Sequence, residues 1–135
     1  WIRQALLLPL RPGSTVVALS SGAAVAGSPL SGGYAGSKAT IRFMSGYAAD
    51  ESARARLGIR FFSVLPKLTA STELGAAAVE AYAHRNDMTV EQYLDEVGPG
   101  ITPEDVGKAT IELVSSAEPT AGAFLLTPAG LSPLQ

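Results

Sequence analysis

A tyrosine and a lysine four residues apart are the side chains in this sequence most able to do chemistry. Tyr34 and Lys38 stand in the stretch SGGYAGSK, where a helix is expected to begin. On a helix, side chains at positions i and i+4 project from one face and can interact. A free tyrosine keeps its proton up to about pH 10, but an ammonium group beside it favours the phenolate. The spacing therefore predicts an acid–base pair that could exchange a proton with a substrate oxygen.

Two serines precede this pair at the end of an expected strand. The stretch STVVALSS has the continuous apolar, β-branched character of a buried parallel strand, and Ser20 and Ser21 close it. Residues 22–33 are rich in Gly, Ser and Pro, which predicts a loop. Ligands of open α/β sheets bind at the carboxyl ends of the strands, so we expect the two hydroxyls and the Tyr34–Lys38 pair to line a binding site.

The elements that must position these residues alternate between helices and strands. Apolar periodicity predicts helices at 1–10, 34–57, 73–85, 89–97 and 102–116, and strands at 14–21, 59–66 and 121–130. Gly58 is expected to end the second helix in the left-handed C′ position. Thr89 with Gln92, and Thr102 with the acidic residues after it, are expected to begin two later helices. Such alternation predicts right-handed crossovers and a parallel sheet with helices on both faces, here half of a doubly wound α/β fold.

Composition limits the possible classes of protein. The chain has 135 residues, of which 47% are hydrophobic and 16% charged, as expected for a globular domain with a core. Its net charge is −2 and its basic residues form no stripe, so we expect no nucleic-acid partner. The absence of cysteine and the single histidine, His84, lead us to expect neither disulfides nor a metal. No apolar run approaches ~20 residues and no signal peptide is evident, so we expect a cytoplasmic protein that does not enter a membrane.

Taken in order, these features resemble the short-chain dehydrogenase/reductase family. The matching stretches are VVALSSGAA with Ser21, YAGSK with Tyr34 and Lys38, GIRFFSVLP with Pro66, and PEDVGKATIELVSS followed by TAGAFLLTPAGL. The resemblance covers nearly the whole chain at the family's spacing. It implies a Rossmann-like fold with a doubly wound parallel sheet, of which this chain is the C-terminal half.

The resemblance also implies a role for each site residue. Tyr34 would exchange the proton with the substrate oxygen, and Lys38 would stabilise the phenolate and hydrogen-bond the nicotinamide ribose. Ser21 would hydrogen-bond the substrate oxygen, unless a one-residue shift assigns that role to Ser20. The hydride would belong to NAD or NADP. The residues implied to bind this cofactor are Tyr34, Lys38, Pro66, Lys67, Leu68, Thr69 and Ser71.

The family pattern extends beyond the residues given. Its dinucleotide fingerprint, the residues that select NAD or NADP, and a catalytic asparagine lie upstream of the matched elements. The chain begins at Trp1 inside an expected helix, so we expect residues 1–135 to be part of one domain of a longer protein. Lys67 stands where the family usually has glycine, and Ser71 where it has threonine.

The implied partners are small molecules and further copies of the chain. The substrate would be a small, apolar secondary alcohol or ketone, covered by a lid formed by residues 67–102. The helices at 1–10 and 34–57, together with the last helix and strand, would pair subunits into a homodimer or homotetramer.

Two other hypotheses remain open at the level of sequence. The chain could be a truncated or degenerate family member that serves association without catalysis. A Ser/Lys acyl hydrolase is the third hypothesis, but the chain lacks a Ser-x-x-Lys motif in a suitable place and its strand order does not fit.

Overall fold

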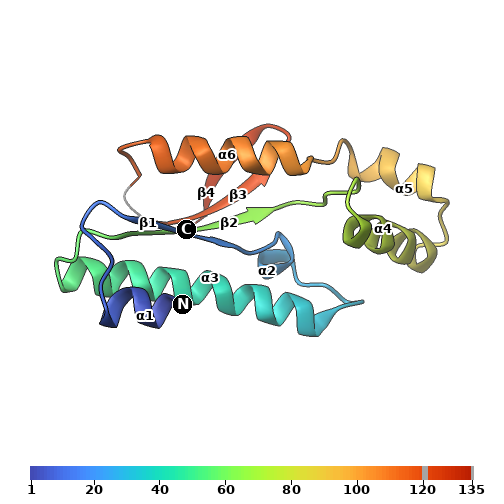
Figure 1. The fold of residues 1–135 in the computed structure, drawn as a ribbon. Helices are drawn as coiled ribbons and strands as arrows, with labels where there is room; N and C mark the ends of the chain where they lie inside the picture. The colour runs from blue at the N-terminus through green and yellow to red at the C-terminus, as the bar shows by residue number, and fades with distance from the viewer. Residues whose placement is uncertain (120–121, 135) are drawn as a thin grey trace.

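A four-stranded sheet forms the centre of the computed structural model, which describes residues 1–119 and 122–134 (Figure 1). The strand order is β1-β2-β3-β4. Neighbouring strands run parallel from β1 to β3, and β4 runs antiparallel to β3. The strands are β1 (Thr15–Leu19), β2 (Arg60–Pro66), β3 (Gly122–Thr127) and β4 (Gly130–Leu134).

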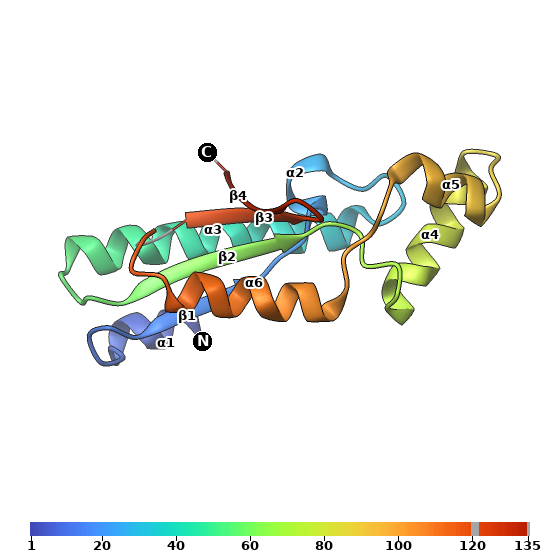
Figure 2. The ribbon, with the colours of Figure 1, turned by 90° about the horizontal axis from the view of Figure 1, so that it is seen from above.

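Helices cover both faces of the sheet, as predicted. Two of them, α1 and α3, lie on one face, and α6 lies on the other (Figures 1 and 2). The pair α4 and α5 forms a separate lobe beyond the carboxyl end of β2 (Figure 2). The helices are α1 (Ile2–Leu7), α2 (Ala23–Ala26), α3 (Gly32–Arg54), α4 (Glu73–Arg85), α5 (Val90–Val97) and α6 (Pro103–Ser115).

The strand β2 lies in the middle of the core and is buried on both of its faces. Phe62 and Val64 pack in one cluster with Leu113 of α6, while Phe61 packs in a second cluster with Ala48 of α3. Successive side chains of a strand point to opposite faces, so a strand between two helical layers is mostly apolar. In β2 the exceptions are Arg60 at its start and Ser63, which is fully buried. A central strand covered by helices on both faces confirms the predicted α/β class.

The two crossovers of the parallel sheet have opposite hands. The chain passes through α3 between β1 and β2, and through α6 between β2 and β3. The strands β1, β2 and β3 lie side by side in that order, so both crossovers move the same way across the sheet. Because α3 and α6 lie on opposite faces (Figure 1), one of the two crossovers is left-handed. The prediction of right-handed crossovers is therefore wrong for one of the two. That preference applies to a helix that packs directly back onto the sheet, whereas the second connection first passes through the α4–α5 lobe.

Several predicted boundaries differ from the structure. The first helix ends at Leu7 rather than at residue 10, because a residue before proline disfavours the helical conformation and Pro9 follows Leu8. The predicted loop 22–33 contains the single-turn helix α2 and the first residues of α3. The last strand was predicted from residue 121, which lies outside the described residues, and the antiparallel strand β4 was not predicted.

The end of α3 is also earlier than predicted. The helix stops at Arg54, and Arg56 rather than Gly58 is the first residue in the left-handed region, with φ of 54°. The hydroxyl of buried Ser52 donates to the Ile59 carbonyl (2.7 Å) and accepts from the Ile59 amide (3.2 Å). The Arg56 amide donates to the Ala53 carbonyl (3.1 Å) and the Leu57 amide to the Ser52 carbonyl (2.9 Å), so a Schellman turn with Arg56 in the left-handed position ends the helix, and Ser52 holds the chain that follows.

Local capping sets the starts of the last three helices. The predicted capping box of Thr89 and Gln92 is confirmed, and Thr102 forms a second one with Asp105. The Thr102 amide donates to the Asp105 carboxylate (2.8 Å). These hydrogen bonds lower the pKa of Asp105, because they stabilise the charged carboxylate.

Arg60 ties three elements together at the beginning of β2. Its guanidinium donates to the Val114 and Ser116 carbonyls at the end of α6, at 2.6 and 2.5 Å. It also donates to the Thr15 hydroxyl in β1 (3.0 Å). The last carbonyls of a helix lack intrahelical partners and attract a cation, so Arg60 caps a helix that has no basic residue in its own last turn.

Candidate functional site

The carboxyl ends of β1 and β2 bring two loops side by side. The Ser20 amide donates to the Val64 carbonyl (2.8 Å), and the Gly22 amide donates to the Pro66 carbonyl (2.9 Å). These bonds continue the parallel ladder beyond β1. The segment with the two serines therefore lies against the segment that begins the predicted cofactor loop.

Tyr34 and Lys38 lie on the first turns of α3, next to the same edge. The Lys38 ammonium is 5.6 Å from the centroid of the Tyr34 ring. It also donates to the Leu19 carbonyl at the end of β1 (3.1 Å). The i, i+4 spacing thus places the two side chains together, as predicted, and the carbonyl of β1 fixes the lysine. The Tyr34 side chain remains 39% exposed and can be reached by a ligand.

The two adjacent serines have different environments. Ser20 is buried, and its hydroxyl donates to the Lys38 carbonyl (2.7 Å). Ser21 is half-buried, and its oxygen accepts from the Ala23 amide (3.2 Å). A serine hydroxyl can donate one hydrogen bond. The Ser20 hydroxyl already donates to α3, whereas the Ser21 hydroxyl only accepts among the described residues. Of the two serines, Ser21 is therefore the one whose hydroxyl can still donate to a ligand.

The predicted cofactor loop starts beside Gly22. A side chain at position 22 would lie 3.5 Å from the Pro66 carbonyl and 3.8 Å from Cγ of Lys67, so the two loops touch. The Lys67 amide donates to the Leu126 carbonyl (3.0 Å), and Lys67 is exposed. Within the described part of the chain, its ammonium makes no hydrogen bond or ion pair.

The rest of this loop leads into α4 through a tight turn. The Leu68 carbonyl accepts from the Ile101 amide (3.3 Å). The Thr69 carbonyl accepts from the Thr72 amide (3.0 Å), and Ser71 is exposed. A Cβ on Gly75 would lie 2.0 Å from the Thr69 carbonyl oxygen, so this position admits only glycine without a shift of the backbone.

These groups suit a nicotinamide dinucleotide at the edge of the sheet. The half-buried or exposed donors at this edge are the hydroxyls of Ser21 and Tyr34 and the ammonium groups of Lys38 and Lys67. Hydroxyls and cations match the ribose hydroxyls and phosphates of such a cofactor.

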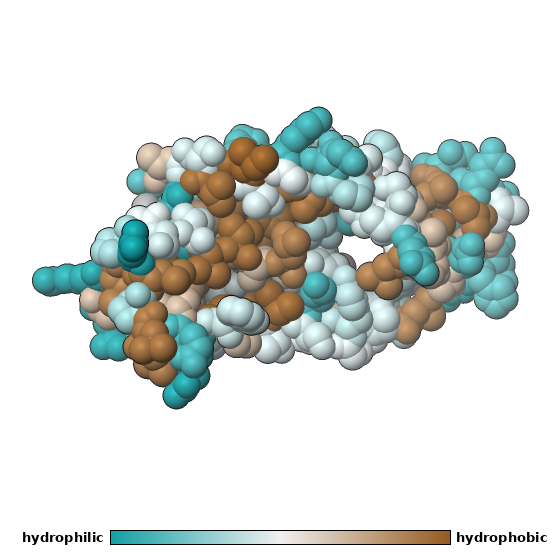
Figure 3. Space-filling view, in the orientation of Figure 1, coloured by the Kyte–Doolittle hydropathy of each residue, from teal (hydrophilic) through white to brown (hydrophobic). Residues whose placement is uncertain are grey.

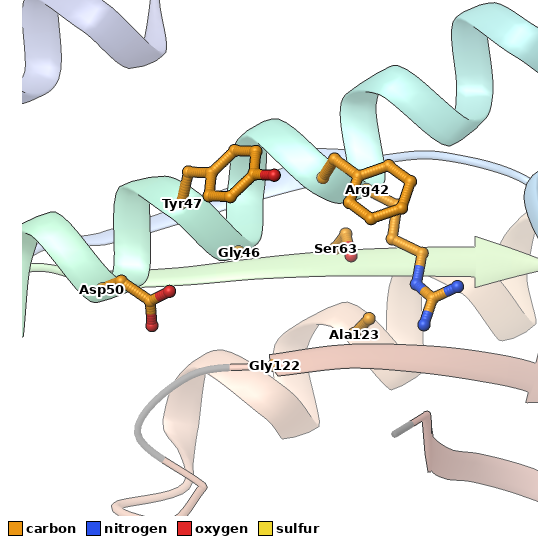
Figure 4. Close-up of a pocket in the computed structure, with 8 residues that line it drawn as sticks. Arg42, Gly46, Tyr47, Asp50, Ser63, Gly122 and Ala123 are labelled. Atoms are coloured by element: carbon orange, nitrogen blue, oxygen red, sulfur yellow. The ribbon is translucent and has the colours of Figure 1, made fainter.

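A hollow lies away from this edge of the sheet. It has a volume of about 230 Å³ between α3 and the strands β2 and β3. Figure 4 shows Arg42 at one end and Asp50 at the other, with Ser63 and Ala123 on the strands below. None of the predicted site residues lines it.

Two classes of feature are absent from residues 1–119 and 122–134. No group of three or more His, Asp or Glu side chains there could hold a metal ion. No helix there is long and apolar enough to cross a lipid bilayer.

The fold and the order of these elements can be compared with known proteins. A family model described as enoyl-(acyl carrier protein) reductase matches residues 2–132. The chain belongs to the short-chain dehydrogenase/reductase family. No curated protein sequence matches the chain.

Solved structures of short-chain dehydrogenases share the fold. A short chain dehydrogenase family protein from Francisella tularensis subsp. tularensis SCHU S4 has 22% identity and a TM-score of 0.66, over 84% of this chain and 48% of its own. Sorbitol-6-phosphate 2-dehydrogenase from Erwinia amylovora has 17% identity and a TM-score of 0.67, over 87% of this chain and 46% of its own. The chain therefore spans about half the length of each of these structures. The similarity confirms the predicted Rossmann-like architecture.

Sequence reasoning missed two features of this short-chain dehydrogenase/reductase site. It did not distinguish the buried role of Ser20 from the open position of Ser21, because both serines end the same strand. It also gave no sign that Tyr82 of α4 contacts Ser28 in the loop before α3, which joins residues 54 positions apart.

Proposed function

We propose that the protein is an NAD(P)-dependent oxidoreductase that interconverts a secondary alcohol and a ketone. The observation that carries this proposal is the Lys38 ammonium 5.6 Å from the Tyr34 ring, fixed by the Leu19 carbonyl beside the half-buried Ser21. Tyrosine, lysine and serine are then the acid, its electrostatic partner and the oxygen-binding donor.

Each of the three side chains has one task in the proposed reaction. In the reducing direction, Ser21 donates a hydrogen bond to the ketone oxygen and stabilises the negative charge that develops there. Tyr34 gives its proton to that oxygen, and the nearby Lys38 ammonium stabilises the resulting phenolate. In the oxidising direction the phenolate of Tyr34 takes the proton from the alcohol. A bound nicotinamide supplies or accepts the hydride.

The predicted cofactor-binding residues lie at the same edge of the sheet, at the carboxyl ends of β1 and β2. In this proposal Lys38 donates to ribose hydroxyls, and the backbone of 66–71 follows the nicotinamide end of the cofactor. Lys67 contributes a positive charge that suits a phosphate, in the position where the family usually has glycine. We assign NAD or NADP to this site without choosing between them.

The experiment is the Tyr34→Phe variant of the natural full-length protein. We expect it to lose more than about 10³-fold in kcat, since proton transfer by a positioned side chain contributes up to about 10⁴-fold. Its unfolding temperature and its NADH or NADPH affinity, read by nicotinamide fluorescence, should stay unchanged. Tyr47→Phe, on the same helix, is the matched control and should keep full activity. Full activity of Tyr34→Phe would refute the assigned role.

The substrate region is the α4–α5 lobe, which we propose to be the lid over the reacting carbon. Residues 67–102 leave the sheet beside the site and return to it at Ile101, which is buried. The half-buried side chains of this segment are mostly apolar or aromatic, which favours a small apolar alcohol or ketone.

A self-association face accompanies the proposed activity. Leu7 of α1 is 58% exposed, and Phe43 and Met44 of α3 are 61% and 46% exposed, so two neighbouring helices present large apolar side chains. We propose that this face pairs subunits into a homodimer or homotetramer. Met44→Glu should lower the mass measured by sedimentation equilibrium. If the protein binds no NADH or NADPH but still associates through this face, association without catalysis is the better hypothesis.

A further inference from the structure

Three hydroxyl groups connect the α4–α5 lobe to the start of the helix that carries Tyr34. The Tyr82 hydroxyl of α4 lies 2.6 Å from the Ser28 hydroxyl. The Ser28 hydroxyl lies 2.5 Å from the hydroxyl of Ser31, which is the N-cap residue of α3. One hydroxyl can donate once and accept twice, so Ser28 can bond to both neighbours at the same time.

The lobe itself is attached to the rest of the molecule through a narrow neck. Its two helices pack mainly against each other, and Tyr82 and Tyr93 stack with ring centroids 6.2 Å apart and 8° between their planes. The neck consists of 67–72 and 98–102, joined by the hydrogen bond from the Ile101 amide to the Leu68 carbonyl. Segments with few contacts to the core open at low free energy. A hydrogen bond outside the neck, such as that between Tyr82 and Ser28, therefore has a large effect on the position of the lobe.

The Ser28 side of this tie is close in sequence to the proposed catalytic residues. Ser31 precedes α3 directly, and its carbonyl accepts from the Ala35 amide (3.0 Å), which neighbours Tyr34. Figure 3 shows an opening through the molecule between the body and the lobe. The hydrogen bond between Tyr82 and Ser28 bridges from the lobe to the body.

We propose that the hydrogen bond between Tyr82 and Ser28 is a latch that holds the α4–α5 lobe against the start of α3, which makes Tyr82 a positioning residue for the substrate. The latch itself is a property of the fold. Its effect on turnover rests on the proposed function, since it assumes that Tyr34 is catalytic and that the lobe covers the substrate.

The first test reads the latch without any turnover. Tyr82→Phe removes one hydroxyl and keeps the ring stacked on Tyr93. In the natural full-length protein, amide hydrogen exchange of 27–31 and of the lobe should become about 2- to 10-fold faster, the factor that corresponds to the loss of one hydrogen bond. Tyr93→Phe is the matched control, because it removes the other hydroxyl of the same stacked pair and leaves Ser28 untouched. Its exchange should match the wild type.

Ser28→Ala tests the partner. It should accelerate exchange in the lobe as much as Tyr82→Phe does, and the double variant should exchange there no faster than either single variant, because both remove the bond between Tyr82 and Ser28. Ser28→Ala also removes the bond to Ser31, so the comparison is made in the lobe and not in 27–31. Exchange in Tyr82→Phe that matches both the wild type and Tyr93→Phe would overturn the latch. Additive effects of the two substitutions would also overturn it.

The second test reads the effect on the substrate. With straight-chain 2-ketones and NADH or NADPH as probes, Tyr82→Phe should raise KM about 2- to 10-fold and leave kcat within about twofold. A fall of kcat with unchanged KM would contradict substrate positioning. If no variant and no wild-type protein reduces a ketone, the proposed function fails while the exchange experiment still decides whether the latch exists.

Discussion

The adjacent serines at the end of β1 offer the sharpest test of the site, because the same substitution should have different consequences at each. Ser21→Ala removes a hydroxyl whose donor has no partner among the described residues. If this donor binds the substrate oxygen, its loss should lower kcat by about 10²- to 10³-fold, as for other donors to a developing oxyanion. The free energy of unfolding should barely change.

Ser20→Ala should instead weaken the fold. The hydroxyl of Ser20 is 5% exposed and donates to the Lys38 carbonyl at 2.7 Å. That carbonyl also faces the amide one turn later in the helix, so removing Ser20 leaves it partly satisfied, and the expected loss is about 1 kcal/mol of stability. A small shift of Lys38 should reduce kcat by less than about tenfold.

The two variants are compared by steady-state kinetics at saturating cofactor and by thermal unfolding, both on the natural full-length protein. The expected result is a crossed pattern, in which Ser21→Ala loses activity and Ser20→Ala loses stability. A larger loss of kcat in Ser20→Ala than in Ser21→Ala would show that the two roles are reversed and would refute the argument from burial and hydrogen bonding.

Three further tests, two of them with a matched control substitution, address what stabilises the surrounding fold. Arg60→Met should destabilise the protein by about 3 kcal/mol, since it removes two charge-assisted bonds to the end of α6, whereas Arg54→Met, which breaks an exposed ion pair, should leave the unfolding temperature unchanged. Gly75→Ala should cost about 1–3 kcal/mol because its Cβ would overlap a carbonyl, while Gly107→Ala, in open space on α6, should raise stability by up to about 1 kcal/mol in urea unfolding. The folded-state pKa of Asp105 is lowered, so the difference in unfolding temperature between the wild type and Asp105→Ala should be complete above pH 3.8 and disappear as the pH falls through the lowered pKa. A difference that does not shrink as the pH falls below 3.8 would contradict the role of its carboxylate.

Local features of this chain could be predicted from the sequence because neighbouring residues cause them. The capping box of Thr89 and Gln92 depends on residues three positions apart, and it begins α5 where expected. Tyr34 and Lys38 are one helical turn apart, so their contact follows once α3 forms. The β-branched apolar run of residues 14–21 predicted a strand, but not its place in the sheet: β1 is a half-buried edge strand, and the strand buried on both faces is β2.

Contacts between distant residues were decided only by the tertiary structure. Ser20 and Ser21 are alike in sequence, and the packing of α3 against β1 determined which hydroxyl is buried. The helix α3 ends at Arg54 in a backbone turn that places Arg56, and not the glycine at position 58, first in the left-handed region, and the bonds of Ser52 with Ile59 hold the chain that follows.

The same distinction explains the site as a whole. The sequence by itself determined which chemistry is present, because a helix of known period places Tyr34 beside Lys38. The tertiary structure decided what surrounds that chemistry: the hand of each crossover, the approach of Lys67 to Gly22, and the bond between Tyr82 and Ser28. These contacts join positions 45 and 54 residues apart, so their geometry depends on how whole helices and strands pack and not on the residues between them.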